Sequence, residues 1–412
     1  MSPSDRTAAE LIAAVDLEAA RRAVTGVAVR TPVLASEELS ALSGGPVVLK
    51  PESLQRSGSF KLRGVLAKVA ALGERAAAGL ISASAGNHGL ALAMTARIRG
   101  IACEVFMPLD ATVSKVNAVE RLGALVHLGG ESVDDALELA AGRAEQRGAA
   151  FVHPFDDLDV IAGQGTLGLE LAEEVPDLAR VVIPLGGGGL ASGVGIALRQ
   201  LHADVELVGV QASACAPYAA GIVGTGGVSD SAAARSTIAD GIAVRRPGAF
   251  TSPLVSDLVA RVETVSEDEI GDAMVSLVEH AKLVAEGAGA VAAAALLSGR
   301  LAPTAGTTVA VISGGNVDSG LLAGVLRRHE TALGRRVRIF TRVRDRPGGL
   351  AELLSLVARA RANLVTLEHV REAVSLHVGE SGVELTLETR GRQHAREVVS
   401  ALEGAGYEVD VE

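Results

Sequence analysis

The chain has 412 residues, a formal net charge of −11 and no Lys/Arg-dense run, which argues against nucleic acid or an anionic membrane surface as its partner. Apolar residues make up 48% of the chain, enough for the cores of two or three folding units, but no run reaches the roughly 18 apolar residues of a membrane helix. Cys103 and Cys215 lie far apart and have no Cys or His at metal-ligand spacing, which predicts buried free thiols in a reducing cytoplasm rather than a disulfide framework or a metal site.

Between about Val47 and Ser313, short β-rich apolar runs alternate with longer helical patterns rich in Ala and Leu. This alternation is typical of parallel strands joined by crossover helices, so we predict an α/β fold with open parallel sheets. In such sheets, ligands bind at the loops that leave the carboxyl ends of the strands. The predicted strands are residues 45–50, 79–84, 102–108, 124–129, 179–186, 205–211 and 307–315.

The pattern changes after Arg336, where the sequence predicts a ferredoxin-like βαββαβ order. The helical stretch before it, residues 321–333, is expected to end the first unit, with a linker near Gly334. We therefore predict a first unit of residues 1–333 and a second unit of residues 337–412. The predicted elements of the second unit are strand 337–343, helix 349–361, strands 364–370 and 382–389, helix 393–405 and strand 407–412.

Lys61 lies in the segment Lys50–Gly64, which joins a predicted strand to a helix expected to begin near Ser59. Taken alone, a lysine near a helix start is usually a solvated surface residue. It becomes a candidate for chemistry only in combination with the turns that follow other predicted strands.

The turn from Ser84 to Gly89 follows a predicted strand and opens a helix. It presents backbone N–H groups, a hydroxyl, the amide of Asn87 and the imidazole of His88, a set that can bind a carboxylate. The alternative interpretation is an ordinary helix N-cap with a glycine turn.

Four consecutive glycines, Gly186 to Gly189, also stand between a predicted strand and a predicted helix. Such a run is costly to order, because each glycine loses much backbone entropy on folding. It makes sense where the backbone wraps closely around a phosphate at a helix N-terminus. The late position of this run in the chain disfavours a dinucleotide-binding fingerprint.

These segments, together with residues 153–166, residues 286–290 and the turn after Ser313, resemble in order and spacing the threonine dehydratase branch of the fold type II pyridoxal-phosphate enzymes. The resemblance covers nearly all of residues 10–330. It implies a tryptophan synthase β-like fold with a smaller substrate subdomain at about residues 53–154 and a larger cofactor subdomain.

The same resemblance implies the roles of individual residues. Lys61 would form the Schiff base with pyridoxal phosphate, Asn87 would bond its phenolic oxygen, and Ser313 would face its ring nitrogen. A neutral hydroxyl does not keep that nitrogen protonated, which favours expulsion of a β-substituent. Lys61 and Ser84 are the predicted catalytic residues. The predicted cofactor contacts are Phe60, Lys61, Asn87, Gly186, Gly187, Gly188, Gly189, Leu190 and Ser313, and the predicted contacts of the substrate carboxylate are Ser84, Gly86, Asn87 and His88.

The implied reaction is elimination of water from L-threonine, which gives 2-oxobutanoate and ammonia as a first step of isoleucine synthesis. Two alternatives remain open, a degradative deaminase of threonine or serine and a non-catalytic protein that binds pyridoxal phosphate and senses amino acids. The similar serine racemases carry a serine where this chain has Ala85, and they bind a divalent ion through an acidic residue where this chain has Gln211. We therefore expect poor racemisation and no such metal site.

The second predicted unit resembles ACT domains, which bind amino acids. This resemblance implies isoleucine or valine as an effector and a homodimer or homotetramer as the assembly. A purely structural or dimerising module is the alternative. The predicted effector residues are Asp345, Arg346, Pro347, Gly348, Gly349 and Leu350 in one loop, with Asn363 before the second predicted strand of this unit.

Overall fold

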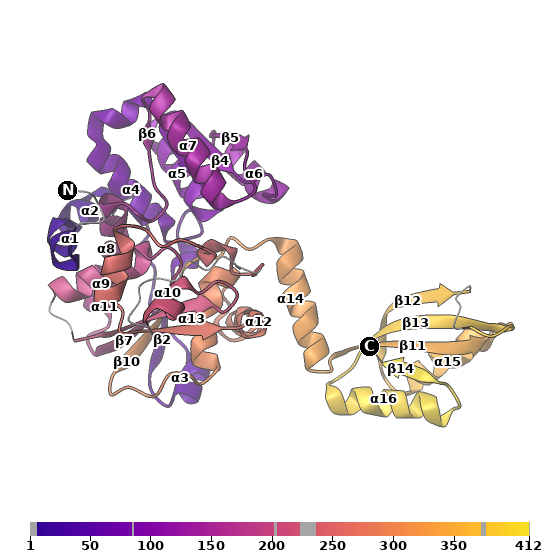
Figure 1. Cartoon of the computed structure of the whole chain (residues 1–412). Coiled ribbons are helices and arrows are strands. Elements are labelled where there is room, and N and C mark those ends of the chain that lie inside the picture. Colours follow the sequence, from indigo (N-terminus) through magenta and orange to yellow (C-terminus); the bar gives the residue numbers. More distant parts are fainter. Residues whose placement is uncertain (1–5, 85, 202–203, 223–235, 372–375, 412) are drawn as a thin grey trace. The chain divides into compact units, whose positions relative to one another are not determined.

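The computed structural model describes residues 6–84, 86–201, 204–222, 236–371 and 376–411 (Figure 1). The described chain divides into two compact units, Met1–Asp318 and Ser319–Glu412. None of its described helices is long and apolar enough to cross a membrane. Cys103 and Cys215 are both buried and unpaired, as the sequence predicts.

The larger sheet of the first unit has the strand order β1-β2-β10-β7-β8-β9 among the described residues. All neighbouring strands in it run parallel except the pair of β1 and β2. Every residue of β10 is buried, as expected for a central strand covered by helices on both faces. The strands are β1 Leu34–Ala35, β2 Val47–Pro51, β7 Leu178–Pro184, β8 Glu206–Ala212, β9 Arg261–Val265 and β10 Thr307–Ile312.

A second, fully parallel sheet of the first unit has the order β5-β4-β3-β6. Its core consists mainly of Ala, Val and Leu side chains, with Cys103 and Met107, and includes residues of the helices α4 (Lys61–Leu72) and α5 (Asn87–Arg99). In both sheets, the loops that carry the candidate residues leave the carboxyl ends of the strands. The strands are β3 Leu80–Ala83, β4 Cys103–Met107, β5 Leu125–Leu128 and β6 Ala150–Phe151.

Small residues allow the helices of the first unit to approach one another closely. A Cβ at Gly193 in α9 would lie 2.4 Å from the carbonyl oxygen of Ile161 in α8, so the two helices pack backbone to backbone. This close contact fixes the position of the glycine-rich start of α9. The helices are α1 Ala8–Ala14, α2 Leu17–Val24, α3 Glu37–Ser43, α4 Lys61–Leu72, α5 Asn87–Arg99, α6 Val113–Glu120, α7 Val133–Arg147, α8 Leu158–Glu174, α9 Gly189–Gln200, α10 Pro217–Ile222, α11 Thr251–Leu258, α12 Glu267–Ser276 and α13 Gly287–Leu297.

Shorter helical turns connect some of these elements. Turns of 3-10 type lie at Glu52–Leu54, Gly73–Ala78 and Asp240–Ile242, and a π-helical turn lies at Leu277–Ala281.

The second unit contains the predicted βαββαβ order, preceded by α14. Its described strands form an antiparallel sheet in the order β12-β13-β11-β14, which is the ferredoxin-like arrangement. The core lies between the sheet and the helices α15 and α16, around Ile339, Leu353, Leu385 and Val398. The elements are α14 Ser319–Ala332, β11 Arg336–Arg344, α15 Gly349–Arg359, β12 Asn363–Val370, β13 Glu380–Glu388, α16 Arg392–Gly404 and β14 Val409–Val411.

The observed elements differ from the sequence prediction in a few places. The short strands β1, β6 and β9 were not predicted, because β1 and β6 have only two residues each and β9 carries charged residues at alternate positions, Arg261 and Glu263. The unit boundary falls at Asp318, so that α14 groups with the second unit. The carbonyl of Ala332 at the end of α14 accepts hydrogen bonds from Arg392, which ties that helix to α16.

Candidate active site

Lys61 is the first residue of α4 and faces the loop after β6. Its Nζ donates a hydrogen bond to the carbonyl oxygen of Pro154 at 2.8 Å and lies 5.2 Å from the ring centroid of Phe60. Burial lowers the pKa of Lys61 to about 8, although the nearby carboxylate of Glu286 raises it. A lysine with such a pKa can act as a nucleophile and as a base near neutral pH.

The start of α4 is set by contacts with a strand end that is distant in sequence. Ser59 forms an isolated β-bridge with Gly314, and the Phe60 N–H donates to the carbonyl oxygen of Ser313 at 3.1 Å. The helix therefore begins at Lys61 rather than near Ser59. These contacts bring Lys61 next to Ser313, about 250 positions further along the chain.

A cluster of buried and partly buried ion pairs holds α4 against its neighbours. The guanidinium of Arg63 contacts the carboxylate of Glu52 at 2.8 Å and that of Glu170 at 2.7 Å, and Arg63 and Glu52 are fully buried. Lys50, also fully buried, contacts Glu170 at 2.9 Å and Glu174 at 2.7 Å. This cluster joins β2, α4 and α8, so it holds Lys61 in place through its own helix.

The four glycines form the turn between β7 and α9, and Gly188 adopts a left-handed conformation with φ +91°. Side chains at these positions would collide with their described neighbours, which leaves the backbone as the surface of the turn. A Cβ would lie 2.9 Å from Ile242 at Gly186, 2.4 Å from Phe155 at Gly187, 2.7 Å from the Tyr218 hydroxyl at Gly188 and 2.9 Å from the Phe155 carbonyl at Gly189.

No described side chain caps the N-terminus of α9, so its first N–H groups are left for a ligand. Leu190 follows them and is buried. A helix N-terminus with uncapped N–H groups and a glycine turn suits an anion of phosphate size.

Ser313 lies at the carboxyl end of β10 and is buried. Its Oγ makes one long contact of 3.5 Å, to the carbonyl oxygen of Ala288. The hydroxyl can therefore donate to a stronger acceptor such as a ring nitrogen.

Asn87 is the first residue of α5 and participates in a hydrogen-bond chain. Its Nδ2 donates to Oε1 of Glu286 at 2.5 Å, and its Oδ1 accepts from Nδ2 of Asn316 at 2.7 Å. Glu286 belongs to the segment 286–290, in which no residue had a predicted role. Its position as a lone carboxyl group at the head of an Ala- and Gly-rich stretch, EGAGA, is the signal that could have identified it.

The remaining predicted residues at the start of α5 differ in what they offer. The Ser84 hydroxyl accepts a hydrogen bond from the Gly86 N–H at 3.0 Å, whereas Ala85 lies outside the described residues. The His88 Nε2 donates to the carbonyl oxygen of Val152 at 3.1 Å. The Nδ1 of His88 is then a lone-pair acceptor, and it has no hydrogen-bond partner among the described residues.

Burial lowers the pKa of His88 to about 3, and the charge of Lys61 contributes to this effect. The ring is therefore neutral at working pH and cannot bind a carboxylate through Nδ1. Only the backbone N–H of His88, at the start of α5, can serve the predicted purpose.

Lys115 and Asp240 were not among the predicted residues. They form an ion pair between α6 and the turn Asp240–Ile242. The Lys115 side chain also passes 3.9 Å from the position that a Cβ at Gly86 would take. A cationic group therefore lies beside the predicted carboxylate site, and a lysine in a surface helix carries no sequence signal for this role.

Both ends of the Gln211 side-chain amide form hydrogen bonds with the backbone. Its Oε1 accepts from the N–H groups of Tyr218 and Ala219, and its Nε2 donates to the carbonyl oxygen of Leu185 at 3.1 Å. Within the described residues, no group of three or more His, Cys, Asp or Glu side chains is arranged to hold a metal ion.

The predicted effector loop connects β11 to α15 in the second unit. Gly348 has φ +89°, and Arg346 contacts both carboxylate oxygens of Glu352 at 3.0 Å. Asn363 pairs across the sheet with Glu388, which in turn pairs with Arg336 at the opposite end of β11. Asn363 is thus about eight residues of strand, roughly 26 Å, away from the loop. One copy of this unit does not bring the two predicted parts together.

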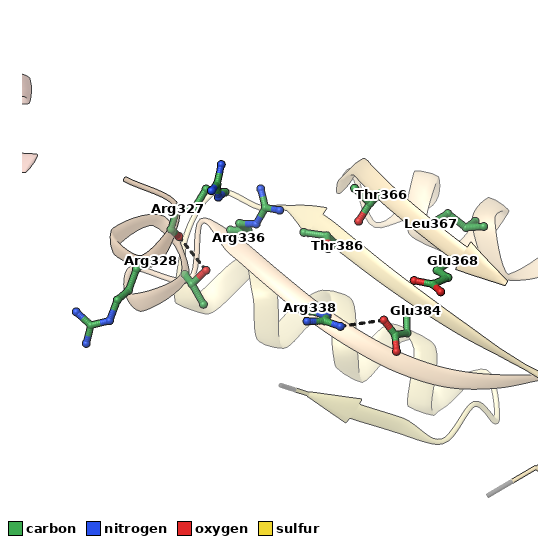
Figure 2. Close-up of a pocket in the computed structure, with 10 residues that line it drawn as sticks. Arg327, Arg328, Arg336, Arg338, Thr366, Leu367, Glu368, Glu384 and Thr386 are labelled. Carbon is green, nitrogen blue, oxygen red and sulfur yellow. Dashed lines mark hydrogen bonds and ion pairs between the residues drawn. The ribbon is translucent and has the colours of Figure 1, made fainter. Parts of the chain in front are cut away.

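A cavity of about 730 Å³ lies elsewhere in the second unit, on the open face of the sheet (Figure 2). Figure 2 shows Arg338 of β11 directed toward Glu384 of β13, with an N–O distance of 2.9 Å. The predicted effector residues are absent from its described lining, which consists of Arg327, Arg328, Thr331, Arg336, Arg338, Thr366, Leu367, Glu368, Glu384 and Thr386.

Comparisons with known proteins agree with this geometry. The family described as "Pyridoxal-phosphate dependent enzyme" matches residues 24–314. The L-threonine ammonia-lyase of Geobacter sulfurreducens is 44% identical over 93% of this chain and 95% of its own length. The L-threonine ammonia-lyase of Thermotoga maritima is 42% identical over 97% of this chain and 100% of its own length, so that match includes most of the second unit. The tomato (Solanum lycopersicum) threonine deaminase isoform 2, in its processed form, has a solved structure that is 31% identical, with a TM-score of 0.69 over 78% of this chain and 92% of its own.

The residues present fit pyridoxal phosphate. The glycine turn and the uncapped start of α9 suit its phosphate, the buried hydroxyl of Ser313 suits its ring nitrogen, and Lys61 has the lowered pKa of a Schiff-base lysine. These groups come from the ends of β7 and β10 and from the start of α4, which the fold brings together. The chain therefore belongs to the pyridoxal-phosphate dependent enzyme family, and within it the chain is an ammonia-lyase.

Proposed function

We propose that the protein deaminates L-threonine to 2-oxobutanoate and ammonia, as a cytoplasmic enzyme at the first step of isoleucine synthesis. The observation that carries this proposal is the convergence of Lys61, with a pKa near 8, and the neutral hydroxyl of Ser313 on one site. Bound pyridoxal phosphate supplies an electron sink that lets a proton leave the α-carbon of an amino acid. The protein's own residues decide which bond breaks after that proton has left.

Lys61 acts as the base that removes the α-proton at its Nζ, and the Pro154 carbonyl orients that amine. Backbone N–H groups from Gly186 to Leu190 bind the phosphate. The Ser313 hydroxyl would donate to the ring nitrogen and leave it unprotonated, so the site would favour loss of the β-hydroxyl over reactions that need prolonged stabilisation of negative charge. Ala85 carries no hydroxyl that could return a proton to the opposite face, so elimination prevails over racemisation.

The substrate carboxylate binds at the start of α5. The N–H groups of Asn87 and His88 lie at the start of the helix and have no partner among the described residues, and Gly86 allows close approach. The Ser84 hydroxyl can donate to the carboxylate while it accepts from the Gly86 N–H. Lys115 adds positive charge nearby.

The test is the rate of 2-oxobutanoate formation from threonine and of pyruvate formation from serine by the enzyme loaded with pyridoxal phosphate. We expect kcat/KM to be higher for threonine. Lys61→Ala is the control, and it should lose at least about 10³-fold in kcat while retaining the folded structure, because it lacks both the Schiff-base nitrogen and the base. Near-normal turnover by this variant contradicts the assignment, and a serine preference favours the degradative alternative. Pyridoxal phosphate binding without turnover by the parent enzyme favours the amino-acid sensor.

We further propose that the second unit is an ACT domain that binds isoleucine or valine in a homo-oligomer. The separation of the loop Asp345–Leu350 from Asn363 supports an assembly, because a second copy is needed to bring these two parts to one ligand. The match to the Thermotoga maritima relative over 97% of this chain supports the second unit as part of the functional enzyme.

An effector titration of three enzymes tests where the effector binds. Asn363→Ala is expected to weaken inhibition at least about tenfold, since it removes a predicted ligand. Arg336→Ala, in the cavity of Figure 2, is the matched control and should respond like the parent. The reverse result would assign the effector to the cavity.

A further inference from the structure

Glu286 occupies the N-cap position of α13 but does not cap that helix. N-cap positions favour Ser, Thr, Asp and Asn, whose short side chains reach back to the first N–H groups. The Glu286 side chain extends instead to Asn87, and the residue is only 6% exposed. A buried carboxyl group that serves no cap needs another reason for its position.

The direction of the hydrogen-bond chain at Asn87 is fixed by the backbone. Nδ2 of Asn316 donates to the Ser57 carbonyl oxygen at 2.8 Å, and a carbonyl oxygen can only accept. The same Nδ2 lies 2.7 Å from Oδ1 of Asn87, which must therefore be the acceptor atom of that amide. As a result, the Asn87 NH₂ group points toward Glu286, which accepts one of its two hydrogens at 2.5 Å.

Two glycines, Gly314 and Gly241, lie next to the Glu286 carboxyl group and leave space for it. A Cβ at Gly314 would lie 2.3 Å from Oε1 of Glu286, and a Cβ at Gly241 would lie 3.7 Å from it. Burial and the neighbouring Asp240 raise the pKa of Glu286 to about 7, against the hydrogen bond from Asn87 and the charges of Lys115 and Lys61. In either protonation state, Glu286 offers Asn87 an accepting oxygen.

We propose that Glu286 is a positioning residue, which holds the Asn87 amide so that its second N–H points to the phenolic oxygen of the cofactor. This inference rests on the proposed function and adds a residue to it. If the acceptor at position 286 is removed, the Asn87 amide loses the partner that fixes its NH₂ group. Asn316 still donates to Oδ1 of Asn87, so the amide does not turn over, but its NH₂ group can swing away from the phenolic oxygen, which weakens that hydrogen bond.

The experiment compares Glu286→Leu with Glu286→Gln, because leucine removes the acceptor and glutamine keeps it. We expect Glu286→Leu to shift the absorption band of the bound cofactor, to raise the Kd of pyridoxal phosphate at least about tenfold and to lower kcat by about 10- to 100-fold. The Kd of pyridoxal phosphate and the kcat of Glu286→Gln should both lie within about threefold of the parent values. Equal damage by both variants would overturn the proposal, because it would assign the effect to the charge.

A double-mutant cycle separates positioning from a direct role. If Glu286 acts through Asn87, the double variant Glu286→Leu/Asn87→Ala should bind the cofactor no more weakly than Asn87→Ala alone. Fully additive losses would contradict the proposal. Asn316→Ala removes the donor to Oδ1 of Asn87, at the other end of the hydrogen-bond chain, and should cause the same spectral shift. This variant keeps the proposal testable if Glu286→Leu does not fold. An unchanged spectrum in Asn316→Ala would count against the proposal.

The matched control is Glu104→Leu, which removes another buried carboxylate of the first unit that contacts Arg143, Arg147 and His127. It should leave the cofactor spectrum unchanged, and a shift like that of Glu286→Leu would contradict the proposal. Absence of 2-oxobutanoate formation by the parent would contradict the proposed function, whereas the spectra and the Kd values would still test Glu286.

Discussion

At the residue scale, the behaviour of Lys61 depends on its environment rather than on its neighbours in sequence. Its amine has one described hydrogen-bond acceptor, the Pro154 carbonyl, and lies in a partly buried setting. A charged ammonium is disfavoured there, which lowers its pKa to about 8. An amine with this lowered pKa loses its proton more readily and is therefore a better nucleophile and base. The same unfavourable environment for its charged form lowers the stability of the folded protein.

This cost predicts a pH-dependent stability of the apoprotein. The folded pKa of Lys61 lies below the unfolded value, so the unfolded state binds more protons between pH 8 and about 10.5, and the contribution of Lys61 to stability improves as pH rises through that window. Lys61→Met should therefore be more stable than the parent apoprotein at pH 7, by up to roughly 3 kcal/mol. Denaturant unfolding at pH 7 and pH 10 measures the difference, which should shrink at pH 10. A constant difference would show that packing, rather than charge, separates the two proteins.

Ser313 allows a second prediction at this scale. Ser313→Asp should protonate the ring nitrogen of bound pyridoxal phosphate, because a carboxylate stabilises the pyridinium form. We expect elimination from threonine to slow at least about tenfold, while exchange of the α-proton with solvent deuterium continues. Product assays and deuterium incorporation measure the ratio of the two processes. Ser313→Ala is the neutral control, and a parent-like ratio in Ser313→Asp would refute the argument.

At the element scale, α4 begins with the reactive Lys61 and is held in place by buried ion pairs of Arg63. Arg63 lies two residues after Lys61 and contacts Glu52, just after β2, and Glu170 in α8. Arg63 and Glu52 are both fully buried, so water cannot solvate the charge of either residue if its partner is removed.

Arg63→Met should therefore destabilise the protein by about 3 to 5 kcal/mol, because the fully buried Glu52 would lose its cationic partner and Glu170 would keep only Lys50. Arg199→Met is the matched control, since Arg199 pairs with Asp257 at 3.3 Å on the surface, away from the cluster. That control should cost less than about 1 kcal/mol. Urea unfolding of both variants provides the measurement, and equal losses would mean that the buried cluster does not hold α4.

At the scale of the whole molecule, each unit has its own core. The core of the second unit consists of residues from β11 to β14 and their two helices, without a residue from before Asp318. A unit with a separate core can be removed without exposing the core of the other.

Removal of Ser319–Glu412 should thus keep threonine deamination within about threefold of the full-length rate and abolish the response to isoleucine or valine. Effector coupling is typically about 1 to 3 kcal/mol, which a paired titration of the two proteins resolves. Unchanged inhibition after truncation would place the effector in the first unit. If neither protein responds, the second unit has a structural role.

Much of this protein can be read from its local sequence. The seven strands predicted for the first unit and the βαββαβ order of the second all occur, because buried strands and amphipathic helices have periodicities that the residues themselves display. The glycine run also stands out locally, because four consecutive glycines are costly to order, whereas Lys61 and Ser313 become candidates only in combination with the other segments.

Tertiary structure alone decided the rest. The orientation of Asn87 depends on Ser57, Asn316 and Glu286, and the position of Lys61 depends on Gly314, all distant in sequence. His88 is a predicted contact of the substrate carboxylate, and only the packed chain shows that its imidazole binds the Val152 carbonyl and leaves the backbone N–H for that role. Hydrogen-bond partners and burial are properties of the packed chain, and local sequence patterns carry no information about which distant groups will meet.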